Sequence, residues 1–197
     1  SLSDLMKAGL SQKLAEGVLH ARSTIRLQEK FDQLQQLGFA VLTWDDPTYP
    51  RYLKESSQPP PVLYMRGSIK PEDDVAVAVV GTRRITGYGR QVAEELGGYL
   101  ARNGITVVSG LARGVDAVTH EAVLRAGGRT LAVFGSGVDV IYPPEYQKMA
   151  GKIIEQGAIL SDYPPGTQPE AVNFPPRNRI ISGLSRIVLV VEAGETS

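Results

Sequence analysis

The chain has 197 residues, 42% of them hydrophobic, and its 21 Lys and Arg balance its 21 Asp and Glu. This composition fits a globular domain with a real core and excludes a wholly disordered chain or a coiled coil. The zero net charge excludes a uniformly basic nucleic-acid binder. The absence of Cys excludes disulfides, zinc–thiolate sites and iron–sulfur clusters, and the two His leave little for a metal site.

The beginning of the sequence carries no export signal. Its first ten residues, SLSDLMKAGL, lack the basic and apolar segments of a signal peptide. No apolar run in the sequence approaches the roughly 20 residues that span a bilayer. We therefore expect a cytoplasmic protein without membrane contact.

Residues 1–38 predict a small helical domain, with one helix from Ser11 to about Arg22 and another from Ser23 to Leu37. Residues 39–74 are predicted to form a connector that leads into the next domain. In this connector Phe39–Trp44 and Val62–Met65 are strand-like, and polar, proline-rich turn segments lie between them.

Residues 75–197 predict an α/β domain with a doubly wound, mostly parallel sheet. Five apolar runs are continuous rather than alternating, as expected of parallel strands buried on both faces. Helical stretches separate the first four runs, which is the βαβ pattern. Only six residues follow the last run, so we expect the natural domain to continue. The strands are predicted at Val75–Val80, Ile105–Val108, Thr130–Phe134, Ala158–Leu160 and Ile187–Val191, and the helices at Gly87–Asn103, Val115–Ala126 and Glu145–Gln156.

The loop after the first of these strands, Gly81–Gly89, places Arg83 and Arg84 among glycines and opens a helix. Helix N-terminal amides bind anions, and the guanidinium fork suits phosphate oxygens. The glycine spacing matches neither a dinucleotide-binding nor a phosphate-loop motif, and no acidic residue ends the second strand, where ribose recognition needs one. We predict an anion-binding loop; the alternative is a tight turn with solvated arginines.

The second loop adds Ser109, Gly110 and Arg113 to the same edge of the sheet. Asp116 and His120 lie four residues apart on the helix that follows and can pair on one face. Because no cysteine or nucleophile-elbow serine completes a triad, we favour a structural role for His120 over a catalytic one.

The third loop, with Gly135, Ser136 and Gly137, directly follows a buried strand. Glycines at this place let a ligand approach the backbone closely. Tyr142, a few residues further on, either stacks on a base or closes the wall of the pocket.

The fourth segment, Asn173–Ser185, begins a helix with prolines and places Phe174 near Arg177, Asn178 and Arg179. Aromatic rings for bases and guanidinium groups for phosphates suit single-stranded nucleic acid, whereas the alternative for Phe174 is a place in the core. Arg177 and Arg179 would not share one helical face, so one can hold structure while the other meets a ligand.

The four segments are expected to meet at one edge of the sheet, because the loops after parallel strands gather there. Few acids or bases accompany their arginines, which favours anion binding over acid–base catalysis. We therefore predict no catalytic residue, no metal site and no cofactor. The clustered arginines are Arg83, Arg84, Arg113, Arg177 and Arg179.

In order and spacing these motifs resemble the DprA/Smf family, bacterial DNA-processing proteins of natural transformation. The likeness covers residues 39–197, and the N-terminal helices are similar to that family's small sterile-alpha-motif-like domain. Asp162, Tyr146 and Pro144 depart from the residues that members usually carry. The matching segments are Val80–Arg83, Ser109–Asp116 with His120, Gly135–Asp139 with Tyr142–Pro143, and Phe174–Ser185, preceded by Asp46–Pro50 and Pro60–Gly67.

The resemblance implies an extended Rossmann-like fold and a non-catalytic protein that binds single-stranded DNA as a homodimer. It also implies that the protein protects incoming DNA, displaces single-strand-binding protein and hands the strand to the RecA recombinase. Together, the loops and the resemblance give the predicted DNA-binding residues Arg83, Arg84, Ser109, Gly110, Arg113, Gly135, Ser136, Gly137, Tyr142, Phe174, Arg177, Asn178 and Arg179.

Two alternatives concern small nucleotides. The nucleotide phosphoribohydrolases share this Rossmann variant, but they need a Pro-Gly-Gly-x-Gly-Thr loop followed by a catalytic Glu, and the sequence has neither. A nucleotide sensor that uses the same anion pocket is the other alternative. A sensor saturates with one nucleotide, whereas a strand binder gains affinity with length.

Overall fold

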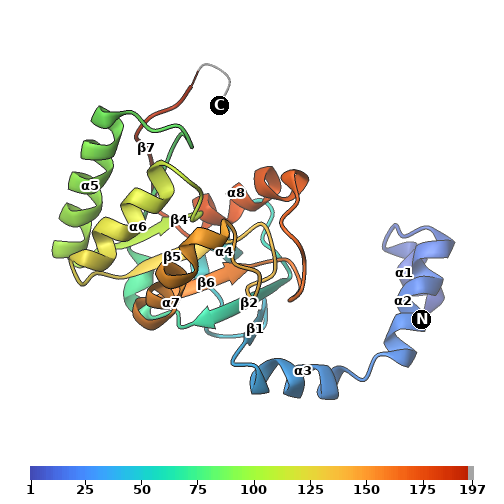
Figure 1. Cartoon of the computed structure of the whole chain (residues 1–197). Helices are drawn as coiled ribbons and strands as arrows, with labels where there is room; N and C mark the ends of the chain where they lie inside the picture. The colour runs from blue at the N-terminus through green and yellow to red at the C-terminus, as the bar shows by residue number, and fades with distance from the viewer. Residues whose placement is uncertain (195–197) are drawn as a thin grey trace. The chain divides into compact units, whose positions relative to one another are not determined.

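The computed structural model describes residues 1–194, which form two compact units, Ser1–Gly38 and a second unit that begins at Phe39 (Figure 1). No helix among these residues is long and apolar enough to cross a membrane.

The first unit contains α1 (Leu2–Lys7), α2 (Gln12–Thr24) and α3 (Leu27–Gln36). The predicted start of the last helix at Ser23 is wrong. The hydroxyl groups of Ser23 and Thr24 donate to the carbonyl of His20 at 2.9 and 2.8 Å, so both residues belong to the final turn of α2. Ile25 then takes an extended conformation, with φ −81° and ψ 120°, which ends that helix.

The second unit is built on a seven-stranded sheet with the order β1-β2-β6-β5-β4-β3-β7. The strands from β6 to β7 in this order run parallel, and β2 and β1 continue the sheet in antiparallel pairing beyond β6. The predicted mostly parallel α/β sheet is thereby confirmed. The strands are β1 (Ala40–Thr43), β2 (Val62–Gly67), β3 (Ala76–Val80), β4 (Thr106–Ser109), β5 (Thr130–Val133), β6 (Ala158–Ser161) and β7 (Ile187–Val190).

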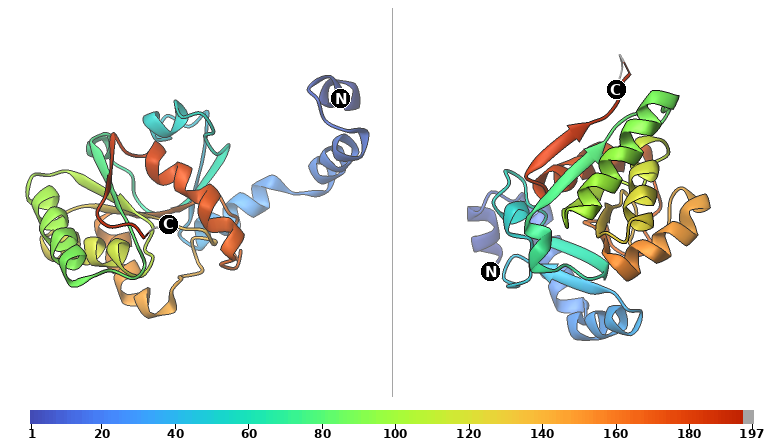
Figure 2. Two further views of the ribbon diagram at one scale, coloured as in Figure 1. Left: turned by 90° about the horizontal axis from the view of Figure 1, so that it is seen from above. Right: turned by 90° about the vertical axis from the view of Figure 1, so that its left-hand side faces the viewer.

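Helices cover both faces of the sheet (Figure 2). One face carries α5, α6 and α7, and the other carries α4 and α8. The helices are α4 (Arg51–Lys54), α5 (Gly87–Arg102), α6 (Val115–Arg125), α7 (Gln147–Gln156) and α8 (Phe174–Gly183), and short 3₁₀ turns are η1 (Pro71–Asp74), η2 (Pro144–Tyr146) and η3 (Ala171–Asn173).

The two helical layers explain why the strand sequences are continuously apolar. In β3, Ala76 and Ala78 join the core beneath α4 and α8, while Val77 and Val79 join the core beneath α5 and α6. Successive residues of a strand point to opposite faces, so a strand covered on both sides needs an apolar residue at every position.

The last strand, β7, departs from this pattern. Ile187, Val188 and Val190 are 56%, 45% and 61% exposed. The prediction that this run is buried on both faces is therefore wrong for the chain described. The reason is its place in the sheet, because β7 ends the strand order and, among residues 1–194, pairs only with β3.

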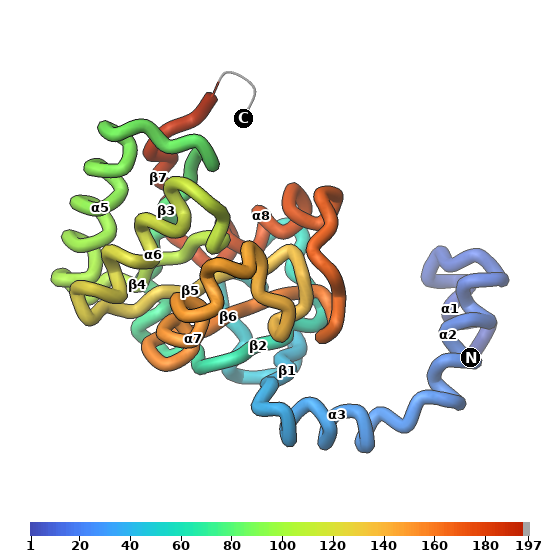
Figure 3. The backbone as a smooth tube through the Cα atoms, in the orientation of Figure 1, coloured from blue at the N-terminus to red at the C-terminus, as the bar shows by residue number. Residues whose placement is uncertain are grey.

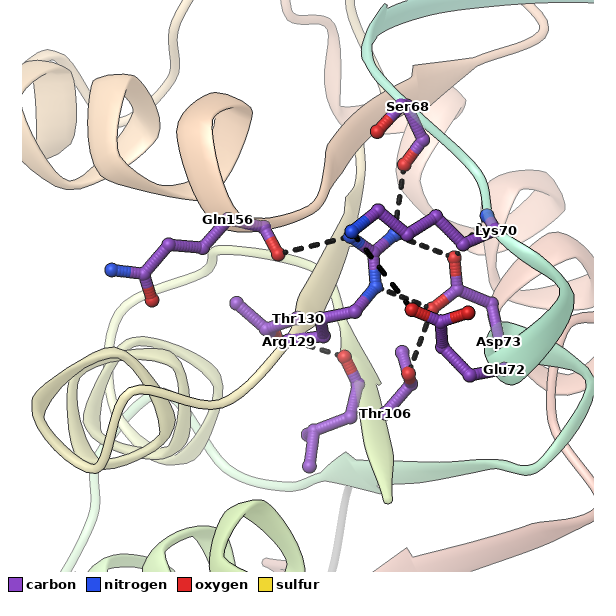
Figure 4. Close-up of polar contacts among 9 residues, drawn as sticks. Ser68, Lys70, Glu72, Asp73, Thr106, Arg129, Thr130 and Gln156 are labelled. Atoms are coloured by element: carbon purple, nitrogen blue, oxygen red, sulfur yellow. Dashed lines mark hydrogen bonds and ion pairs between the residues drawn. The ribbon is translucent and has the colours of Figure 1, made fainter. Parts of the chain in front are cut away.

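At the amino ends of the parallel strands, a buried ion pair joins η1 to the sheet (Figure 4). The Arg129 guanidinium donates to both carboxylate oxygens of Asp73, at 2.9 and 2.7 Å, and to the Ser68 carbonyl at 2.9 Å. The same carboxylate accepts the Thr106 hydroxyl at 2.7 Å and the Lys70 amide at 2.8 Å. The side chains of Arg129 and Asp73 are only 17% and 4% exposed, and their hydrogen bond raises the pKa of Arg129.

Candidate nucleic-acid interface

The glycine-rich and arginine-rich segments meet at the carboxyl ends of the parallel strands, as predicted. A cleft of about 760 Å³ is lined by residues of the β3–α5 loop, the β4–α6 loop, α8 and β7. A smaller pocket beside it joins the β3–α5 and β4–α6 loops to Tyr142, Pro143 and Phe174. The residues common to both are Arg83, Ala112 and Phe174.

Phe174, the first residue of α8, is half-buried at the centre of this edge. The guanidinium groups of Arg83 and Arg177 lie 5.4 and 5.8 Å from its ring centroid, and the ring of Tyr142 lies 5.9 Å away at 39°. Gly135 lies against the ring, because a Cβ built there would be only 2.9 Å from it. One part of the ring therefore packs within the protein and the other is exposed, and whether a base stacks on it stays a prediction.

Arg177 is a structural residue of the site. It is 4% exposed and donates to the carbonyl of Gly110 at 3.2 Å and to the carbonyl of Val133. Burial lowers the pKa of Arg177, and the negative charge of Asp116 acts in the opposite direction. Its guanidinium therefore ties α8 to the ends of β4 and β5.

The side chains of Asp116 and His120 do not pair, so that interpretation of their spacing is wrong. Asp116 accepts the amides of Gly110 and Ala112 at 3.1 and 3.4 Å, because it lies in the first turn of α6, where the loop folds back over it. Burial raises the pKa of Asp116, while Arg177 and these amides lower it. Asp116 thus holds the loop.

His120 lies one turn further along α6 and is completely buried. Its Nδ1 lies 2.7 Å from the hydroxyl oxygen of Thr130, the first residue of β5. Burial, with a smaller contribution from Arg177, lowers the pKa of His120 to about 3. This neutral, hydrogen-bonded side chain occupies the structural role that we favoured.

Two further arginines of the predicted cluster are neutralised by carboxylates. Arg113 lies 2.7 Å from Glu145, with both side chains about half exposed, and Arg179 lies 2.6 Å from Asp162. By contrast, Arg83 and Arg84 are exposed and form no ion pair within residues 1–194. The cluster of five arginines therefore contains fewer uncompensated charges than the sequence suggests.

The remaining predicted residues build the floor of the site. The hydroxyls of the buried Ser109 and Ser136 donate to backbone carbonyls at 2.7 and 2.8 Å, and the amide of Gly137 donates to another at 2.9 Å. Gly110 is enclosed between Arg177 and Asp116. Asn178 is exposed beside these groups. Whether any of these residues contacts DNA stays a prediction.

Sequence analysis missed Glu192, which follows β7. One of its carboxylate oxygens accepts the amide and the hydroxyl of Thr86 at 3.0 and 3.2 Å. Thr86 is the N-cap of α5, where we expected a free anion-binding position. A signal existed, because an acidic residue directly after a predicted parallel strand lies at the same edge as the loops. Within residues 1–194, no group of acidic and His side chains could hold a metal ion.

Comparisons with known proteins identify relatives of this chain. The sequence model of DNA recombination-mediator protein A matches residues 40–197. Protein Smf of Synechocystis is 44% identical over 189 residues, which are 94% of this chain and 48% of that protein. The chain thus spans about half the length of the curated relatives that it matches.

Two solved structures are similar over most of the chain. DNA processing protein A of Streptococcus pneumoniae superposes with a TM-score of 0.87 at 34% identity, covering 100% of this chain and 68% of that one. A structure that concerns the single-stranded DNA binding mode of DNA processing protein A from Helicobacter pylori superposes with a TM-score of 0.72 at 34% identity. It covers 81% of this chain and 71% of that one.

Proposed function

The chain belongs to the DNA recombination-mediator protein A family, and from that premise we propose that it binds single-stranded DNA at the edge around Phe174. One observation carries the proposal: the uncompensated Arg83 guanidinium lies 5.4 Å from the ring centroid of a half-exposed aromatic residue. The single-stranded DNA binding mode of the Helicobacter pylori relative supports it.

The chemistry of the edge suits a flexible strand. Tyr142, 40% exposed, and Phe174 offer ring faces on which unpaired bases can stack, and Arg83 offers donors to the phosphate between them. Bases in a duplex are already stacked on their neighbours, so they cannot reach these rings. Binding at this edge should therefore favour single strands and depend little on sequence.

The predicted DNA-binding residues divide into two groups under this proposal. Arg83, Arg84, Tyr142, Phe174 and Asn178 present exposed or half-exposed groups, and these make the first contacts. The residues of the second group already make contacts within the protein. They either determine the shape of the binding edge or contact DNA only after they release an intramolecular partner. The second group consists of Ser109, Gly110, Arg113, Gly135, Ser136, Gly137, Arg177 and Arg179.

As a recombination mediator, the protein would bind and transfer a DNA strand without making or breaking covalent bonds in it. We infer that it protects incoming DNA, displaces single-strand-binding protein and passes the strand to RecA, as a cytoplasmic homodimer and without catalysis. The buried, engaged state of Asp116 and His120 supports the non-catalytic role, because neither offers a free acid or base to a substrate.

The test compares ligands by fluorescence anisotropy. Oligothymidylates of increasing length should bind with increasing affinity, and a duplex of equal length should bind more weakly. The logarithm of the affinity should fall with the logarithm of salt concentration by about 0.7 per phosphate neutralised. Equal affinity for duplex and single strand, or saturation by a nucleoside monophosphate, would contradict the proposal.

A further inference from the structure

Glu192 holds the loop between β3 and α5 at two points. Its carbonyl accepts the amide of Thr82 at 2.8 Å, at the start of the loop. Its carboxylate accepts the amide and hydroxyl of Thr86 at 3.0 and 3.2 Å, at the end of the loop. Arg83 and Arg84 lie between these two anchors. Figure 3 shows the segment that follows β7 running beside this loop.

Glycines lie where Glu192 approaches most closely. A Cβ on Gly81 would be 2.7 Å from the Glu192 carbonyl oxygen, and a Cβ on Gly89 would be 2.1 Å from its carboxylate oxygen. Neither glycine has a left-handed backbone, so the requirement at both positions is space. The loop and the first turn of α5 are thus shaped around this one residue, at Gly81 by its backbone and at Gly89 by its side chain.

The carboxylate also changes where an anion can bind. A helix N-terminus favours negative charge, and Glu192 already supplies one to α5. An incoming phosphate at this edge is therefore left with the exposed guanidinium groups of the loop, of which that of Arg83 lies over Phe174.

We propose that Glu192 is a positioning residue for DNA binding: by holding both ends of the β3–α5 loop, it keeps Arg83 over Phe174, where the strand's phosphate meets it. This inference rests on the proposed function. It assigns to Glu192 no contact with DNA.

The first test is a pair of substitutions at Glu192, with oligothymidylate affinity as the readout. Glu192→Ala removes the side-chain anchor and should weaken binding about fivefold, or about 1 kcal/mol. Removal of a negative charge alone would instead strengthen binding to DNA. Glu192→Gln keeps an acceptor oxygen for Thr86 and should bind at least as tightly as the parent. Unchanged or tighter binding by Glu192→Ala would overturn the proposal.

A second test leaves Glu192 in place. Gly89→Ala should push the carboxylate off Thr86, since the added methyl group meets the flexible end of that side chain. Because Ala favours a helix over Gly, thermal stability should not fall, yet DNA binding should weaken as in Glu192→Ala. Gly87→Ala is the matched control, as a Cβ there meets nothing within 4 Å. Equal affinities of the two variants would count against the proposal.

A double-mutant cycle shows whether Glu192 acts through Arg83. In an Arg83→Ala background, Glu192→Ala should have no further effect on affinity. The same fivefold loss in both backgrounds would overturn the proposal. If Arg83→Ala weakens binding while Glu192→Ala and Gly89→Ala do not, the inference fails and the proposed function stands. If the parent chain does not bind oligothymidylate, both fail.

Discussion

The two ends of the parallel sheet use arginine in opposite ways. At the amino ends, Arg129 is mostly buried, meets both oxygens of Asp73 and donates to a backbone carbonyl. At the carboxyl ends, Arg83 is exposed and lies over the ring of Phe174 without a carboxylate partner in residues 1–194. The guanidinium of Arg129 thus forms hydrogen bonds that hold the fold together, whereas that of Arg83 has donors available for a ligand.

This contrast separates stability from binding. A buried and bidentate ion pair becomes costly when one partner is removed, because the other charge stays in the protein without compensation. An exposed guanidinium remains hydrated and contributes little to folding, but it can form charge-assisted bonds with a phosphate. Substitutions at the amino ends should therefore change the free energy of unfolding, and substitutions at the carboxyl ends should change the affinity for DNA.

The largest effect on stability is expected at the amino ends. Asp73→Ala leaves Arg129 without its carboxylate and should lower the free energy of unfolding by about 4 kcal/mol. Urea denaturation measures this loss, with Arg102→Ala on the exposed end of α5 as the control. The protein that remains folded should bind oligothymidylate with unchanged affinity, and a selective loss of DNA binding would break the comparison.

Arg177 should stabilise the fold as Arg129 does, although it lies at the carboxyl ends of the strands. Arg177→Met removes the donors to Gly110 and Val133 and leaves Asp116 buried without its cation. We expect a loss of about 3 kcal/mol in unfolding free energy, together with weaker DNA binding. Near-parent thermal stability for this variant would show that its guanidinium is not part of the structural framework.

Arg83→Ala should weaken DNA binding without lowering stability. Affinity for oligothymidylate should fall roughly tenfold to a hundredfold, since bonds to a charged group contribute about 1.5–3 kcal/mol. The melting temperature should hardly change. Arg83→Lys should not fully restore binding, because an ammonium lacks the planar fork. Arg125→Ala, at an exposed position in the last turn of α6, serves as the control, and its effect should stay below about threefold.

A pH dependence of stability is expected from His120, which contacts Thr130, the residue next to Arg129. The pKa of His120 is lowered to about 3 in the folded protein, so its stabilising effect is complete above the unfolded value near 6.5 and declines below it. Between pH 7 and pH 5 this residue should cost about 2 kcal/mol of unfolding free energy. His120→Gln should remove that component, and an unaltered pH dependence in the variant would exclude His120 as its source.

The backbone plan could be predicted from the sequence because it depends on local patterns. Continuous apolar runs marked the strands, and the loops that follow them had to gather at one edge. The state of the arginines could not be predicted in the same way. Glu145, Asp162 and Glu192 come from segments distant in the chain, and only the folded structure shows that the first two meet arginines and the third meets Thr86.

Two errors have the same origin. The sequence of β7 is as apolar as a central strand, yet its place at the end of the sheet leaves it exposed. Asp116 and His120 have the spacing of a helical pair, but each finds a closer partner outside the helix. In both cases the burial of a residue or its side-chain partner depends on tertiary contacts that a local sequence pattern does not contain.

Gly135 gives this site a simple route of evolutionary change. Any larger residue at position 135 would displace the ring of Phe174, since even a Cβ would lie 2.9 Å from it. A single substitution at this position can therefore tilt the aromatic ring while every proposed DNA-contacting residue around it keeps its identity. Variation in strand affinity between homologues can thus arise from a shift in the position of the Phe174 ring.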